Sequence, residues 1–511
     1  MSFTECIALA LFDWHHSTFR LPVIKRSMHP DGSLTLRRRN ALDRFPNELL
    51  STIFFFAIER HDEPNTLTIS PTTISHICHS WRQVALATGN LWTNIVLTFP
   101  TSSEQLTRTL TWLSRSKTYP LDILLDFRDP DWDWEGEETH GFRWADMEAV
   151  LRLLLPSAAR WRTFELLTDT WAPIFVFLLR TQKLNVLEHL EKLHLARCNA
   201  YFARKGQLFE PTALGQHLPL FDEEAAVPRL REVTLTGVHI AWSAPPLANL
   251  TKLELKYQAA DVMPTVTQFA QILSRCPNLE VLAIVGRGPQ LTTNEEVPAS
   301  AGGSAEAAVA RALRGTIKLR GVTQFIFGFV DVNYAIQLLS LFDLPSLRDL
   351  NLEDVSASLR HQPPDDAGQL FDWITATPRD SPLDTRDSVN VVSTSPGPFP
   401  LAQLHALALN SIHAPLPAFV RLYQACIGIQ DLRLCEVADC AMEALETTAG
   451  SNPPLEVCST SRAEDTLPHL QTLFVRGADE HLFSRVVRTR ALDLDASFEA
   501  STLTEYTDDD Y

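Results

Sequence analysis

Three residues that can bind a metal lie close together in the stretch SHICHSW, namely His76, Cys78 and His79. Imidazole and thiolate are ligands that zinc prefers, and a structural zinc site needs four of them. On a helix, His76 and His79 share a face while Cys78 points elsewhere, and no second pair of ligands follows. The spacing therefore does not predict a metal site.

Other clusters of polar residues also lack the spacing that catalysis needs. Cys435 and Cys440 in CEVADC are not spaced as zinc ligands or as a redox pair. His189 and His194 in LEHLEKLHL are five positions apart, which suits neither a helix-borne metal pair nor a catalytic triad. The sequence contains no Gly-x-Ser-x-Gly elbow, P-loop or HExxH helix. We predict a chain that is not an enzyme and has no cofactor.

The segment 126–140, DFRDPDWDWEGEETH, places carboxylates around Trp132 and Trp134. Calcium binding needs an ordered spacing of ligands, as in an EF-hand, and that order is absent. We expect a loop that faces solvent, with contact to a basic partner as the alternative. The carboxylates concerned are Asp129, Asp131, Asp133, Glu135, Glu137 and Glu138.

Bulk properties limit the partners and the compartment. A formal charge of −18 argues against nucleic acid or an anionic membrane as the main ligand. Eight cysteines in 511 residues are too sparse for a disulfide scaffold, so the compartment is expected to be reducing. The N-terminus carries Glu5 where a secretory peptide would be positive, and no stretch approaches the roughly 20 apolar residues of a membrane span. We predict a cytoplasmic or nuclear protein.

A chain of this length exceeds one ordinary core, so its organisation matters. Residues 1–40 show no sustained periodicity and are taken as a leader, and residues 41–98 carry a dense helical pattern. The helix that begins at Pro46 has an apolar face that covers about half of its circumference, given about 100° of rotation per residue. That face combines Leu49, Ile53 and Phe56 with Leu50, Phe54, Ala57 and Ile58, while Phe55 lies among the polar residues.

Two further elements complete this region. After a polar break at 59–70, the segment 71–88 is predicted as a second amphipathic helix. A strand-like stretch follows a turn at Gly89. The apolar positions that define the second helix are Ile74, Ile77, Cys78, Trp81, Val84 and Ala85.

Beyond about residue 180, the pattern apolar-x-x-apolar-x-apolar recurs. Start-to-start spacings cluster near 20–29 residues or about twice that, and several copies follow an amphipathic helix, such as the one that carries Val266, Phe269, Ile272 and Leu273. A helix plus a short strand at this period is typical of leucine-rich repeats. The copies are LEKLHL (190–195), LREVTL (230–235), LTKLEL (250–255), LEVLAI (279–284), LRDLNL (347–352), LHALAL (404–409), IQDLRL (429–434) and LQTLFV (470–475), with VTQFIF (322–327) as a looser match.

These copies are degenerate. Only the first has Asn or Cys three residues after its last apolar position, at Cys198. We expect an irregular α/β solenoid over 99–495, with loop insertions near 286–308, 361–400 and 448–468, because closing a long loop grows costly only slowly. Residues 496–511 are expected to form an acidic tail.

The stretch 42–97 resembles an F-box domain. That motif has a Leu-Pro pair, an apolar helix with Glu-Leu-Leu and Ile-Phe, a second helix with Val-Cys-x-x-Trp-Arg, and then Leu-Trp. Phe45 replaces the usual leucine, and a 12-residue break separates the helices. The matching elements are Phe45-Pro46, Glu48-Leu49-Leu50, Ile53-Phe54, Ile77-Cys78, Trp81-Arg82 and Leu91-Trp92.

The resemblance implies a partner for the excess apolar surface of the first helix. One side of this helix would pack within the motif, and the small adaptor subunit that links F-box proteins to a cullin scaffold would bury the other. The expected adaptor-binding residues are Phe45, Pro46, Leu49, Leu50, Ile53, Phe54, Ile77, Cys78, Trp81, Leu91 and Trp92. Of these, Trp81 fits the core better than the interface, because a large indole at this spacing usually pins one helix to another.

An F-box followed by degenerate repeats is similar to the large families of such proteins in mushroom-forming fungi. In such solenoids, strand residues between the apolar positions face the concave surface, where they would bind an unidentified target protein. Their mixed charge favours a protein surface over phosphate or a single ion. The expected target-binding residues are His194, Thr234, Thr236, Glu254, Lys256, Asn351, Glu353, Asn410, Arg433 and Arg476.

The sequence therefore predicts a substrate-recruiting subunit of an SCF-type E3 ubiquitin ligase. A protein–protein interaction scaffold without any ligase is the alternative, and an enzyme with an unrecognised site is the third reading. Binding to the adaptor subunit separates the first two.

Overall fold

The computed structural model describes residues 45–58, 70–132, 139–198, 208–222, 225–243, 247–291, 317–358, 366–376, 399–446, 466–490 and 495–499. Within these residues the protein is an α/β structure built on one large parallel sheet. The predicted leader 1–40 lies outside the described residues, and so do most of the predicted insertions at 286–308 and 448–468.

The helical region before the sheet contains three α-helices, α2 (Asn47–Ile58), α3 (Pro71–Ile77) and α4 (His79–Ala87), and the 3₁₀ turn η2 (Gly89–Trp92). We call residues 45–92 the helical unit. The prediction of one helix over 71–88 was wrong, because Cys78 is extended, with φ −154° and ψ 171°. Ser70 caps the first half through Thr72 N, and the Cys78 thiol accepts a hydrogen bond from Trp81 N at the start of the second.

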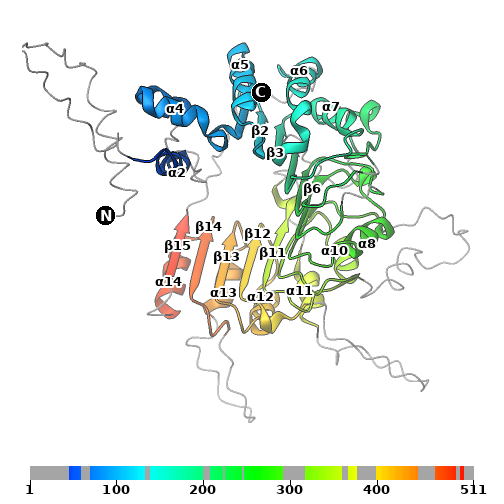
Figure 1. The fold of residues 1–511 in the computed structure, drawn as a ribbon. Helices are drawn as coiled ribbons and strands as arrows, with labels where there is room; N and C mark the ends of the chain where they lie inside the picture. The colour runs from blue at the N-terminus through cyan, green and yellow to red at the C-terminus, as the bar shows by residue number, and fades with distance from the viewer. Residues whose placement is uncertain are drawn as a thin grey trace, which may run out of the picture.

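Thirteen strands follow in chain order in the main sheet, and each pairs in parallel with its neighbours. Figure 1 shows the sheet as a curved band. The strands are β1 (Asn94–Thr98), β2 (Leu121–Phe127), β3 (Trp161–Thr168), β4 (Lys192–Arg197), β5 (Glu232–Thr236), β6 (Lys252–Gln258), β7 (Val281–Gly286), β9 (Gln324–Phe329), β11 (Asp349–Asp354), β12 (Ala406–Asn410), β13 (Asp431–Cys435), β14 (Thr472–Arg476) and β15 (Asp495–Glu499), and a separate pair consists of β8 (Ile317–Lys318) and β10 (Phe342–Asp343).

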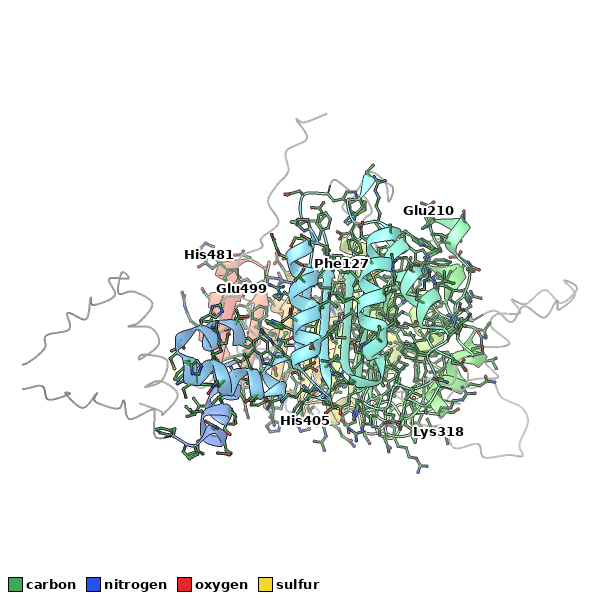
Figure 2. The ribbon with its side chains drawn as sticks, turned by 45° about the horizontal axis from the view of Figure 1, so that its top comes forward. Phe127, Glu210, Lys318, His405, His481 and Glu499 are labelled. Carbon is green, nitrogen blue, oxygen red and sulfur yellow. The ribbon has the colours of Figure 1, made fainter. Side chains whose placement is uncertain are left out.

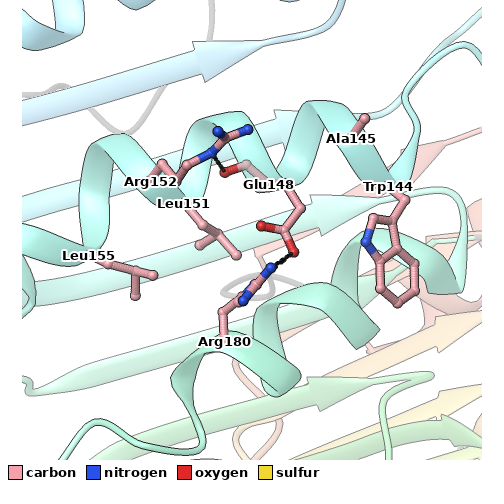
Figure 3. Close-up of a pocket in the computed structure, with 7 residues that line it drawn as sticks. All are labelled: Trp144, Ala145, Glu148, Leu151, Arg152, Leu155 and Arg180. Atoms are coloured by element: carbon pink, nitrogen blue, oxygen red, sulfur yellow. Dashed lines mark hydrogen bonds and ion pairs between the residues drawn. The ribbon is translucent and has the colours of Figure 1, made fainter.

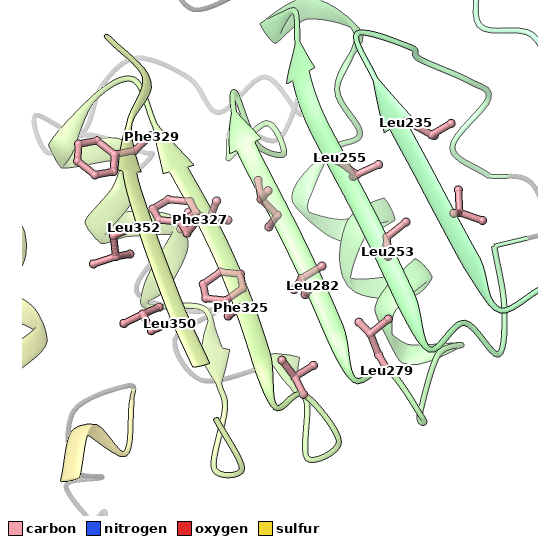
Figure 4. Packing of buried hydrophobic residues seen from close by; sticks show 14 of the residues in the cluster. Leu235, Leu253, Leu255, Leu279, Leu282, Phe325, Phe327, Phe329, Leu350 and Leu352 are labelled. Carbon is pink, nitrogen blue, oxygen red and sulfur yellow. The ribbon is translucent and has the colours of Figure 1, made fainter. Parts of the chain in front are cut away.

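Helices cover one face of this sheet, where alternate strand residues form the main core. Leu253, Leu282, Phe325 and Leu350 follow one another across neighbouring strands on this face (Figure 4) and are all buried. The described α-helices that lie between strands of the sheet are α5 (Ser103–Arg115), α6 (Trp144–Leu154), α7 (Trp171–Thr181), α8 (Val266–Ser274), α10 (Val332–Leu339), α11 (Gly368–Thr375), α12 (Leu416–Ala425), α13 (Cys440–Glu446) and α14 (Glu480–Arg490).

The predicted repeats all coincide with strands of this sheet, and the first apolar residue of each copy lies just before its strand. The residue that follows this apolar residue has the same hydrogen-bonding role in successive copies. The carbonyl of Glu191, for example, accepts bonds from the N–H groups of both Arg231 and Glu232, at 2.9 and 3.1 Å. The same forked bond recurs at eight successive junctions, with the acceptor carbonyls on Glu191, Arg231, Thr251, Glu280, Thr323, Arg348, His405 and Gln430.

The carboxyl ends of several strands also share a backbone feature. A residue at the end of the strand or directly after it adopts a left-handed conformation, with φ between 50° and 90°. Its N–H donates to the neighbouring strand in four cases, for instance from Gly237 to Lys256 O at 2.7 Å. The residues in this conformation are Gly237, Tyr257, Gly286, Ser411, Glu436 and Gly477. These lateral bonds tie neighbouring strands where the sequence lacks a regular asparagine.

Three boundaries differ from the sequence expectation. The sheet begins at β1, inside the predicted helical region 41–98, and β2 and β3 join it before the first predicted repeat at 190–195. The insertion at 361–400 contains α11, which buries Leu370 and Phe371 against the core. The acidic tail begins later than predicted, because residues 496–499 belong to β15, which pairs with β14; the rest of the tail lies outside the described residues.

Candidate functional site

The helical unit has its own small core. The ring of Phe54 on α2 lies 4.8 Å from that of Trp81 on α4, centroid to centroid. The indole Nε1 of Trp92 donates to Ala85 O at 2.8 Å, so the largest side chain of this core leaves no donor unpaired. The residues buried in this core are Leu50, Phe54, Ile74, Val84, Ala85, Leu91 and Trp92.

The opposite side of α2 carries apolar side chains that the chain does not cover. Leu49 is 51% exposed and Phe56 is 58% exposed, and Phe45 and Phe55 are also exposed. Leu49 and Phe56 lie seven positions apart on α2, so they fall on one face of the helix, and Phe45 lies just before the helix begins. We call these three residues, together with the neighbouring Phe55, the α2 apolar surface. Large exposed apolar side chains that cluster in this way mark interaction sites more often than single ones do.

The eleven residues predicted to contact an adaptor divide into three groups. Phe45, Pro46, Leu49 and Cys78 are exposed, and Ile53, Ile77 and Trp81 are half-buried. The remaining four, Leu50, Phe54, Leu91 and Trp92, are buried in the helical unit itself. Burial corrects the role expected for these four, because a side chain enclosed by its own chain supports the surface rather than forming it. Phe55 and Phe56 were not among the predicted contacts, although a helical projection could have placed Phe56 beside Leu49.

Several contacts fix the helical unit against the first part of the sheet. Trp92 meets Trp112 of α5 edge to face at 5.6 Å, and the guanidinium of Arg115 lies 4.4 Å from the centre of the Trp92 ring. Lys117 Nζ donates to Ala87 O at 2.6 Å. In Figure 2 the helical unit, in blue, lies at one end of the row of helices and beside the cyan helices that follow it. Its position relative to the sheet is therefore set by packing.

The ten residues predicted to bind a target lie on the face of the sheet opposite the main core, which we call the open face. In one row across the strands, His194 pairs with Thr234 and Thr234 pairs with Glu254; Asn351 and Arg433 lie further along this row. The next row, two residues along each strand, contains Thr236, Lys256, Glu353, Asn410 and Arg476. The structure thus brings all ten onto one surface.

Ion pairs join neighbouring strands on the first half of the open face. Glu254 accepts a hydrogen bond from Thr234 Oγ1 at 2.8 Å, and its carboxylate lies 3.3 Å from Lys256 and 3.4 Å from Lys252. Burial alone would raise the pKa of Glu254, but Lys256, Thr234 and Lys252 together lower it below the ordinary value. Lys192 and Glu232 form a further pair at 2.8 Å. The charged side chains of this half of the open face therefore pair with one another.

The second half of the open face leaves more of its charge exposed. The side chain of Arg433 is 62% exposed, and its Nη2 lies 3.4 Å from Asp431 Oδ2. Arg476 Nε lies 4.0 Å from Glu436 Oε1, which is a long distance for an ion pair. Burial raises the pKa of Glu353, against the opposing effect of Lys256. Asn410 Nδ2 donates to Asn351 Oδ1 at 2.8 Å, which orders both amides. Polar groups held in this way suit recognition of a protein surface.

The sequence analysis missed a buried polar pair beside the carboxyl ends of β2 and β3. His140 Nε2 lies 3.1 Å from Asp169 Oδ2, which also accepts a bond from Asp129 N at 2.7 Å. The other ring nitrogen of His140 accepts from Phe142 N at 3.0 Å. Both nitrogens are engaged, so the pair ties Asp129, His140 and Phe142 to Asp169 and has a structural role.

The same loop corrects one expectation about Trp132. This residue was expected to face solvent, but its ring is buried against His140, with centroids 5.1 Å apart. Its Nε1 donates to Thr139 Oγ1 at 2.9 Å. Residues 133–138, with Trp134 and most of the carboxylates, lie outside the described residues.

No protein-family model matches this chain, and no curated protein is significantly similar to it. None of the helices in the described ranges could cross a membrane; the longest runs for 13 residues, whereas a span needs about 20.

Proposed function

We propose that the chain is the target-recruiting subunit of an SCF-type ubiquitin ligase. The helical unit is an F-box that binds the small adaptor of the cullin scaffold through the α2 apolar surface. The strands that follow form a leucine-rich-repeat-like solenoid whose open face binds the target. Ubiquitin transfer takes place on partner subunits, and this chain contributes by holding the target near them.

The observation that carries this proposal is the unequal burial of the two sides of α2. One side, with Leu50 and Phe54, completes the core of the helical unit, while the other, with Leu49 and Phe56, remains exposed. Burying one such side chain contributes about 1.5–3 kcal/mol. A few anchors of this size in desolvated pockets carry most of the binding energy of a typical interface.

The repeating strands support the second half of the proposal. A surface made of parallel strands from successive units gives a long row of side chains at regular spacing. Each unit adds one residue to each row, as the register of β4, β5 and β6 shows for His194, Thr234 and Glu254. Such a row suits an extended contact with another protein.

The test is co-expression of the full chain with the cullin adaptor, followed by affinity capture and size-exclusion chromatography. We expect a 1:1 complex. The double substitution Leu49→Asp and Phe56→Asp should abolish it and leave the circular dichroism spectrum unchanged. Ile427→Asp provides the matched control, because Ile427 is an equally exposed apolar residue far along the chain, at 47% exposure. A wild-type chain that folds but does not bind the adaptor would overturn the ligase proposal and favour the interaction-scaffold alternative.

A further inference from the structure

A surface cavity of about 600 Å³ lies between α6 and α7, away from both surfaces described above. Figure 3 shows that α6 contributes Trp144, Glu148, Leu151 and Arg152, and that Arg180 reaches in from α7. The volume falls within the range of about 300–1,000 Å³ that is usual for ligand pockets. The proposed function makes no use of this cavity.

The charged groups of the cavity leave a net positive charge. Arg180 bridges the two helices, because its Nε and Nη2 both lie 2.6 Å from Glu148 Oε1. Arg152 Nε donates to the backbone oxygen of Glu148 at 3.3 Å, so its guanidinium lies along α6 at the edge of the cavity (Figure 3). In the described part of the chain, the Nη groups of Arg152 make no hydrogen bond. The cavity lining thus carries two guanidinium groups and one carboxylate, in a chain whose formal charge is −18.

Apolar surface flanks these charges on both sides. Trp144, 38% exposed, forms one end of the cavity, and its ring is held 5.5 Å from that of Phe175. Leu155 lies at the other end and Leu151 between them (Figure 3). Tryptophan and arginine are the residue types most enriched at binding hot spots. A planar guanidinium also suits a carboxylate, because it can donate two parallel bonds to it.

We propose that this cavity binds a short linear segment of a partner protein in which one acidic side chain lies between two apolar ones. The carboxylate pairs with Arg152, and Arg180 adds its charge while it keeps its bond to Glu148. One apolar side chain of the segment packs on Trp144 and the other on Leu155. The site is a second docking point on the helix-covered side of the sheet, separate from the open face.

Fluorescence anisotropy with the full-length chain tests this inference. The probe is fluorescein-Gly-Leu-Asp-Phe-Gly-amide, and its partner probe carries Asn in place of Asp. Both are amidated, so a terminal carboxylate does not contribute. We expect saturable binding of the Asp probe and at least tenfold weaker binding of the Asn probe, since bonds to a charged group are about twice as strong as neutral ones.

Variants separate the cavity from general charge attraction. Arg152→Gln and Trp144→Ala should each weaken binding of the Asp probe at least tenfold. Arg488→Gln, at an exposed arginine on α14, should leave it unchanged. Equal binding of the two probes, no binding of either, or an unchanged affinity in Arg152→Gln would overturn the proposal. Adaptor capture is measured separately with Leu49 and Phe56, so either idea can fail alone.

Discussion

Leu49 and Leu50 are consecutive residues of α2, about 100° apart around its axis, and only one of them is buried: Leu49 is 51% exposed and Leu50 is 3% exposed. Leu50 belongs to the core of the helical unit. The pair places the same residue type in two environments, one exposed and one buried, on neighbouring positions of one helix. It can therefore separate a binding role from a folding role.

We expect Leu49→Asp to weaken adaptor binding at least tenfold while the melting temperature changes by less than 2 °C, because exposed substitutions usually cost under about 0.5 kcal/mol. Leu50→Ala should instead lower the free energy of unfolding of the helical unit by about 2–5 kcal/mol. Differential scanning calorimetry and adaptor titration measure the two effects. Loss of stability in Leu49→Asp would show that this side of α2 is buried in solution.

Trp92→Phe tests the hydrogen bond that closes the helical unit. The substitution retains an aromatic ring but removes the donor to Ala85 O, which then keeps only the 3.3 Å bond from Thr88 N. We expect the free energy of unfolding to fall by about 0.5–1.5 kcal/mol, measured by urea denaturation followed by near-ultraviolet circular dichroism. Trp144→Phe, at an exposed tryptophan, is the control and should change stability by less than about 0.5 kcal/mol.

The contribution of Glu254 to the free energy of unfolding should be lost at acid pH. Its pKa is lower in the folded chain than in the unfolded one, because Lys256, Thr234 and Lys252 outweigh the effect of burial. The contribution is therefore complete above the unfolded pKa and is lost as the pH falls through the folded value. Glu254→Gln should destabilise the chain at pH 7, and the difference from wild type in urea denaturation should shrink below about pH 4.5. A difference that grows on acidification would contradict this account.

Glu353 should behave in the opposite way. Burial raises its pKa in the folded chain, so its favourable contribution is complete below the unfolded pKa and is lost as the pH rises through the folded value. Glu353→Gln keeps the shape and removes the charge. We expect this variant to be as stable as wild type near pH 4 and more stable at pH 7, in the same urea series. Destabilisation at pH 7 would mean that a cation pairs with this carboxylate in solution.

The strands of the repeats could be predicted because three apolar positions per copy leave a strong pattern. The residue after the first of them, such as Glu191 or Arg231, has no side-chain signature, because its role depends on the backbone carbonyl alone. The shared forked bond was therefore not visible in the sequence. Strand β2 was missed even though its buried residues Leu121, Ile123, Leu125 and Phe127 alternate with half-buried ones, because it lacks the leading apolar residue that marks the other copies.

The orientation of α2 could not be predicted for a different reason. A helical projection shows that Leu49 and Leu50 both belong to a wide apolar face, but it does not say which edge meets the protein. That choice depends on Trp81 and Trp92, which lie some 30 to 40 residues further along the chain. Likewise, the position expected to hold asparagine is filled by Gln258 in one copy, whose amide donates to the carbonyls of Leu235 and Val238.

The forked bonds from Glu191 to Gln430 join each unit only to the next. Force applied to the C-terminal end of the sheet would therefore load one seam at a time, beginning at β15, where the strand has a neighbour on one side in the described structure. When the chain is pulled from that end in an optical trap, we expect the strands to separate one after another, in a series of steps of similar size. A single rupture of the whole sheet would require contacts that bypass neighbouring units.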